Sequence, residues 1–136
     1  DAAGEQLPRF PHLNAVVAQA QLASIKRDTD AFASAIEELK FYIESGDDQA
    51  IAWDRRVSLF LVLLQGGEYA LARDQLRACF DEMDEAKLRS LTPGVLFRFL
   101  SFCETAKIGF QKPELQQLAR ELLPADLRNR LVPRAN

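Results

Sequence analysis

Apolar residues recur at steps of three and four along most of this chain, which is the spacing of one face of an α-helix. Glycine, proline or short acidic residues separate the stretches that follow this pattern. We expect helices over residues 13–27, 31–45, 49–65, 68–83, 85–91, 94–108, 113–123 and 125–131. No stretch alternates apolar and polar residues with a period of two, so no strand is expected. The pattern therefore predicts an all-α fold of seven or eight helices.

The 136 residues are enough for one domain with a proper core. Pro8 and Pro11 predict an irregular leader over residues 1–12, because proline lacks the amide hydrogen that a helix interior uses. We expect a single helical domain over residues 13–132, followed by a short tail over residues 133–136.

Two of the predicted corners between helices repeat one another. They read Asp30-x-Phe32-x-x-Ala35-x-x-x-Leu39 and Gly67-x-Tyr69-x-x-Ala72-x-x-x-Leu76. The aromatic residues stand 37 positions apart, and a helix of similar length precedes each corner. The chain therefore contains a repeated helix pair. A third pair, 94–108 with 113–123, keeps only the hairpin shape.

The second corner resembles that of the tetratricopeptide repeat. The resemblance implies that Gly67 turns the corner, that Tyr69 wedges between the paired helices, and that Ala72 lies where they cross most closely. The sequence departs from the family at Phe60, where the family has Gly or Ala, and its spacing exceeds the family's 34 residues. The resemblance covers roughly residues 13–86. It implies antiparallel helix hairpins stacked as a short right-handed superhelix, and a generic antiparallel bundle is the alternative.

The resemblance also implies a binding groove, because the first helix of each pair lines the inner face of such a superhelix. The family's groove positions fall on Val17, Ala20, Gln21, Ser24, Arg27, Asp54, Val57, Ser58, Leu61 and Gln65. This mixed polar lining with an apolar strip suits a peptide or helical segment of a partner protein. Arg27 and Asp54 are the residues that we expect to select the ligand. The implied function is a non-catalytic adaptor or chaperone-like module.

Other interpretations stay open. The chain's own C-terminal helices could cover the groove, or the domain could be structural and self-associating, with no groove ligand. The C-terminal end is mildly basic, which could also dock an acidic partner. Its basic residues are Lys112, Arg120, Arg128, Arg130 and Arg134. Charge reversal at Arg128 and Arg130 tests self-association through this end.

Composition narrows the remaining classes. With 48% hydrophobic and 27% charged residues and a net charge of −3, the chain is typical of a globular protein that does not bind nucleic acid. Its longest apolar run, Leu59 to Leu64, is too short to insert into a membrane. The first residues lack the pattern of a signal peptide, which favours a cytoplasmic location. The chain begins without Met, so a processed or excised product is an open alternative.

Residues that could support catalysis or hold a metal or cofactor are sparse. His12 is the single histidine, and no nucleophile accompanies it in a triad-like pattern. Cys79 and Cys103 each lie on the apolar side of a predicted helix, and we interpret them as buried, reduced side chains, with a disulfide as the alternative. We therefore expect no enzyme activity, no metal and no cofactor.

Overall fold

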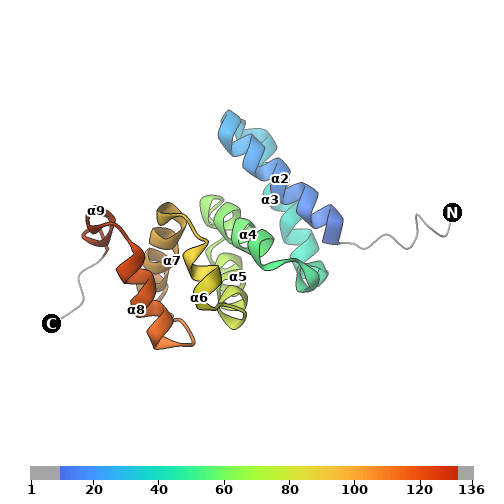
Figure 1. The fold of residues 1–136 in the computed structure, drawn as a ribbon. Coiled ribbons are helices and arrows are strands. Elements are labelled where there is room, and N and C mark those ends of the chain that lie inside the picture. Colours follow the sequence, from blue (N-terminus) through green and yellow to red (C-terminus); the bar gives the residue numbers. More distant parts are fainter. Residues whose placement is uncertain (1–9, 132–136) are drawn as a thin grey trace. The chain divides into compact units, whose positions relative to one another are not determined.

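The computed structural model describes residues 10–131, which form helices joined by short turns (Figure 1). The α-helices are α2 (Phe10–Lys26), α3 (Thr29–Glu44), α4 (Trp53–Gln65), α5 (Tyr69–Asp81), α6 (Glu85–Arg89), α7 (Pro93–Ala106), α8 (Pro113–Leu122) and α9 (Ala125–Arg128). A 3₁₀-helix, η1 (Asp47–Ala50), precedes α4. Within this range there is no strand, so the predicted all-α class is confirmed. The predicted tail, 133–136, and the first nine residues of the predicted leader lie outside the described residues.

The chain divides into two compact units, and the division falls inside α5, between Leu76 and Arg77. In the first unit, α2 packs against α3, α4 and η1, and α3 also packs against η1. Figure 1 shows α2 and α3 running side by side in opposite directions. In the second unit, α8 packs against α6 and α7, and α9 packs against α7. The prediction of one domain over residues 13–132 stays a prediction.

Side-chain caps explain the starts of three helices, α3, α6 and α7. The carboxylate of Asp28 accepts a hydrogen bond from the Ala31 amide at 3.1 Å, which caps α3. The hydroxyl of Thr92 accepts from the Val95 amide at 3.3 Å, which caps α7. By contrast, α2 begins at Phe10, inside the expected leader. Pro11 then lies in the first turn, where an amide hydrogen has no partner within the helix and its absence costs little.

One predicted helix starts later than expected. Residues 49–52 do not belong to α4, which begins at Trp53. The backbone carbonyl of Asp48 accepts a hydrogen bond from Arg56 Nη2 at 2.7 Å. Because this carbonyl bonds a side chain, the short η1 forms at 47–50 in place of a continuous α-helix, and an extended Ile51 leads into α4.

The first helix of each pair ends in the same way. Arg27, Gly67 and Lys107 have positive φ angles of 58°, 79° and 58°. The amide of the following residue donates to a carbonyl five residues back in each case: Asp28 to Ala23, Glu68 to Leu63 and Ile108 to Cys103. This is the Schellman motif, which satisfies carbonyls at a helix end. Successive ends lie 40 residues apart.

Burial follows the same 40-residue spacing in the first helices. Equivalent positions in α2, α4 and α7 are buried in three sets: Val16, Arg56 and Leu96; Ala20, Phe60 and Leu100; Ala23, Leu63 and Cys103. The second helices agree, since Ala35, Ile36 and Leu39 of α3 match buried Gln75, Leu76 and Cys79 of α5. The structure therefore consists of packed neighbouring helix pairs whose spacing is compatible with a helical repeat.

This spacing replaces the 37-residue alignment of Phe32 with Tyr69. Tyr69 is 62% exposed, so it does not wedge between helices. Ala72 is fully buried, as expected for the residue near a close helix crossing. Gly66 allows the side chain of Ile36 in α3 to lie close to the backbone at the end of α4, because a Cβ on residue 66 would lie 3.0 Å from Ile36 Cδ1.

The second unit has an aromatic centre. The ring of Phe80 stacks on that of Phe110 with 4.2 Å between centroids. The ring of Phe99 meets Phe80 edge-on at 6.2 Å.

Candidate functional site

The predicted groove residues divide by exposure. Val17, Ala20 and Val57 are buried, so a ligand on the surface would not touch them. The others reach the surface in part or fully: Gln21, Ser24, Arg27, Asp54, Ser58, Leu61 and Gln65. They come from α2 and α4, which pack together in the first unit.

Two of these residues bond one another across the two helices. Gln65 Nε2 donates a hydrogen bond to Ser24 Oγ at 2.7 Å. The contact joins positions 41 residues apart near the C-terminal ends of α2 and α4. It fixes one end of the surface that both helices contribute to.

Arg27 and Asp54 are not brought together. Arg27 directly follows the last residue of α2, three residues beyond Ser24, and so lies at the end that Gln65 fixes. Asp54 lies in the first turn of α4. At 1.5 Å per residue, the helix from position 54 to position 65 spans roughly 16 Å, so the two charges mark opposite ends of this surface.

The prediction missed an exposed apolar side chain beside these residues. Ile25 is 79% exposed and follows Ser24 directly. In the 40-residue spacing it occupies the same place as Gln65. Its position off the buried line of α2 was the available signal. We call Gln21, Ser24, Ile25, Ser58, Leu61 and Gln65 the α2–α4 face.

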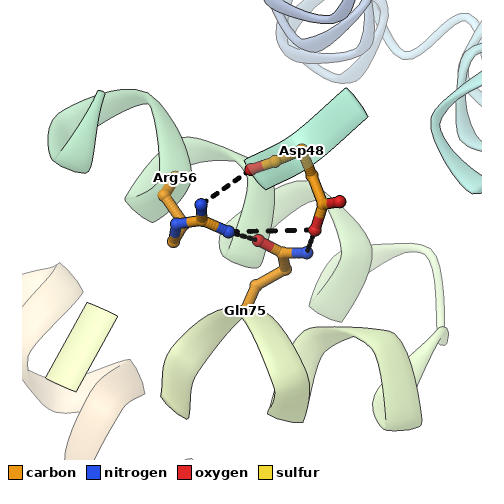
Figure 2. Close-up of polar contacts among 3 residues, drawn as sticks. All are labelled: Asp48, Arg56 and Gln75. Carbon is orange, nitrogen blue, oxygen red and sulfur yellow. Dashed lines mark hydrogen bonds and ion pairs between the residues drawn. The ribbon is translucent and has the colours of Figure 1, made fainter. Parts of the chain in front are cut away.

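A second polar cluster lies inside the first unit and was also missed. Arg56 Nη1 donates to Gln75 Oε1 at 2.6 Å, and Gln75 Nε2 donates to Asp48 Oδ2 at 2.7 Å. Arg56 also forms an ion pair with Asp48 at 3.8 Å. Figure 2 shows the three side chains converging from η1, α4 and α5. The cluster links three elements of the chain.

The buried polar cluster is not open to a ligand. Asp48, Arg56 and Gln75 are only 6%, 6% and 2% exposed. Their equivalents 40 residues later are all leucines: Leu88, Leu96 and Leu115. The same three places in the repeat thus accept either a bonded polar set or an apolar one. We interpret the cluster as a structural connection between helices.

The remaining candidates for chemistry are enclosed or paired. Cys79 and Cys103 are both buried, and neither forms a disulfide. Burial, then the nearby Glu104 carboxylate, raises the pKa of the Cys103 thiol to about 12, while Arg120 acts in the opposite direction. Such a thiol stays protonated at neutral pH and is a poor nucleophile.

The basic residues of the C-terminal end are partly engaged. Arg120 forms an ion pair with Glu104, and Arg128 Nη2 donates to the Leu123 carbonyl at 2.9 Å. Lys112 and Arg130 are exposed, and Arg134 lies outside the described residues. In residues 10–131 no group of three His, Cys, Asp or Glu side chains could hold a metal ion. Over the same range no helix has the length and hydrophobicity to cross a membrane.

No protein-family model, curated protein or solved structure matches this chain.

Proposed function

We propose that this chain is a non-catalytic protein-interaction module of the tetratricopeptide-like class. It binds a peptide or helical segment of a partner protein on the α2–α4 face. The observation that carries the proposal is that Ile25 is 79% exposed next to the bonded Ser24–Gln65 pair. An exposed apolar side chain and an ordered polar pair thus both lie near the C-terminal end of α2, and a peptide-binding surface uses both kinds of contact.

The helices that carry this face are already packed, which lowers the entropy cost of binding. Ile25 and the partly exposed Leu61 offer apolar contacts. The amides of Gln21 and Gln65 both donate and accept hydrogen bonds. The face therefore suits a segment with apolar side chains on one side and polar groups around them.

The charges at the two ends of the α2–α4 face set the direction in which the partner's peptide binds. Arg27 stands at one end of the face and Asp54 at the other, roughly 16 Å apart along α4. A ligand with an acidic residue near Arg27 and a basic residue near Asp54 satisfies both. Their separation in the ligand is about 11 residues if it is helical and about five if it is extended.

The test is selection from a displayed library of random short peptides, followed by titration with the selected peptides. We expect Leu61→Asp and Ile25→Asp to abolish binding while circular dichroism shows unchanged helix content. Ser34→Asp is the matched control, because Ser34 is exposed on α3 and lies away from the face. Failure to select any peptide, or equal binding by wild type and Leu61→Asp, would refute the proposal.

A further inference from the structure

An exposed aromatic residue, Phe41, lies on the side of α3 that faces away from the core. It is 64% exposed, and its ring meets that of the half-buried Tyr42 edge-on with 5.8 Å between centroids. The buried side of α3 carries Ala35, Ile36 and Leu39 instead. Phe41 therefore takes no part in the core of the first unit.

The helical repeat does not account for an aromatic side chain at this place. The residues that stand 40 and 80 positions after Phe41 are Asp81 and Glu121, and both are exposed. In the later helix pairs the place is thus polar and in contact with water, so the packing of one pair on the next does not cover it. Aromatic residues are enriched where proteins contact other proteins. A partner from outside the repeat is therefore the best account of Phe41.

Carboxylates flank Phe41 on the same helix. Glu38 stands three residues before it and Glu44 three residues after it, so the two lie on either side of Phe41 around the helix. Both carboxylates are exposed. The one basic residue of α3, Lys40, already forms ion pairs with two other carboxylates at 3.5 Å each. The surroundings of Phe41 are therefore acidic and complement a basic partner.

Glu44 stands at a place that does not favour folding. It is the last residue of α3, and the last turn of this helix holds no basic residue. The C-terminal end of a helix carries the negative end of its dipole, so a carboxylate there lowers stability and a cation there raises it. A cation supplied by a partner compensates both the dipole and the charge of Glu44.

We propose that Glu38, Phe41, Tyr42 and Glu44, which we call the Phe41 patch, bind an arginine-bearing basic segment of a partner protein. A guanidinium is planar and always charged, so it can stack on the Phe41 ring and donate to a carboxylate at the same time. A second basic residue of the segment pairs with the other carboxylate, roughly 9 Å away along the helix. None of these residues belongs to the α2–α4 face, so this inference does not depend on the proposed function.

Titration of the whole chain with short peptides, followed by NMR, tests the patch. Three peptides of one sequence are compared, which carry arginine, lysine or the uncharged citrulline. We expect the arginine peptide to bind most tightly and to shift the ring signals of Phe41 and Tyr42, the lysine peptide to bind more weakly, and the citrulline peptide not to bind. Phe41→Leu keeps an apolar side chain without the ring, and it should weaken binding of the arginine peptide about two- to fivefold. Absence of binding, equal binding of arginine and lysine, or an unchanged Phe41→Leu overturns the inference.

Glu44→Gln separates a loss of binding from a loss of folding. It should weaken binding of the arginine peptide about two- to fivefold. It should also raise the melting temperature by roughly 1–4 °C, because a negative charge leaves the C-terminal end of α3. Asp30→Asn is the matched control, because it removes the same charge from the first turn of α3, roughly 16 Å from Phe41. We expect it to bind like the wild type.

Two further outcomes concern other occupants of the Phe41 patch. If Asp30→Asn weakens binding as much as Glu44→Gln does, net charge alone attracts the peptide, and the inference is overturned. Sedimentation of the chain by itself gives the second outcome. A dimer that Phe41→Leu dissociates would mean that a second copy occupies the patch, which also overturns the inference.

Discussion

At the scale of single residues, the buried polar cluster makes a sharp prediction. Arg56→Leu alone leaves the Asp48 carboxylate buried without its ion pair, and we expect it to destabilise the protein by about 3–5 kcal/mol. Replacing Asp48, Arg56 and Gln75 together by leucine copies the set at Leu88, Leu96 and Leu115. We expect that triple variant to match the wild type or exceed it by about 1–4 kcal/mol. Urea denaturation followed by circular dichroism measures both.

The comparison of the single and triple variants decides the role of the cluster. If the triple variant unfolds as easily as Arg56→Leu, the hydrogen bonds of the cluster are required for the stability of the fold. In that case leucines cannot replace the polar side chains, although the two sets stand 40 residues apart in the repeat. If the single variant costs nothing, the bonds at 2.6 and 2.7 Å contribute little net stability.

The second residue prediction concerns the pKa of Cys103. Burial raises the pKa of this thiol from 9.0 to about 12, so the folded state favours the protonated form. The resulting stabilisation is present below pH 9 and is lost as the pH rises toward 12, because the unfolded chain then gains from ionising its thiol. We expect the wild type to lose more unfolding free energy than Cys103→Ala over this alkaline range. Parallel pH profiles for the two proteins would contradict it.

At the scale of the elements, the repeated helix ends predict opposite effects at equivalent positions. Gly67→Ala should cost about 1 kcal/mol, because its φ of 79° is unfavourable for a residue with a Cβ. No atom lies within 4 Å of that Cβ, so the cost comes from the backbone alone. Arg27→Gly should relieve the same strain and stabilise the folded state by up to about 1 kcal/mol. Part of this gain is offset because glycine increases the conformational entropy of the unfolded chain. Thermal unfolding measures both changes.

Lys107→Gly is the independent check on this prediction, because Lys107 has the same φ of 58° as Arg27 but lies in the second unit. A loss of stability in both glycine variants would show that the charged side chains stabilise the helix ends more than the backbone strain costs.

The elements also show what the sequence could predict. The helices follow from the apolar periodicity of the sequence, and local caps such as Asp28 and Thr92 begin two of them. The start of α4 depends on Asp48 bonding Arg56 and Gln75, which requires the folded chain. The aromatic positions do not reveal the 40-residue register, because Tyr69 is exposed and the register depends on the helix ends at Arg27, Gly67 and Lys107.

The candidate site follows the same rule. The resemblance to the tetratricopeptide repeat placed Leu61 and Gln65 in one groove, and in the structure Leu61 is partly exposed and Gln65 is exposed. No periodicity within one helix could show that Gln65 bonds Ser24, since the partners belong to different elements 41 residues apart. The sequence therefore indicated which residues to consider, and packing decided which of them meet.

At the scale of the whole molecule, the proposed ligand direction can be tested by exchanging the charges at the two ends of the face. Peptides selected on the wild type should carry an acidic residue toward Arg27 and a basic one toward Asp54. Arg27→Glu with Asp54→Arg should lose these peptides and bind versions with the two charges swapped. Isothermal titration of both peptide sets against both proteins gives the four binding free energies of a double-mutant cycle, from which the coupling between the protein and peptide charges is obtained.

The exchange is expected to leave the fold intact. Arg27→Glu keeps a residue with a Cβ at the same positive φ, so the backbone strain is unchanged. Asp54→Arg places a positive charge in the first turn of α4, which costs about 0.3–1 kcal/mol. High salt should weaken both matched pairs, because exposed charges are screened. If both proteins bind both peptide sets equally, the apolar contacts at Ile25 and Leu61 bind the ligand without selecting its direction. If the charge-swapped protein binds only the charge-swapped peptides, Arg27 and Asp54 orient the ligand.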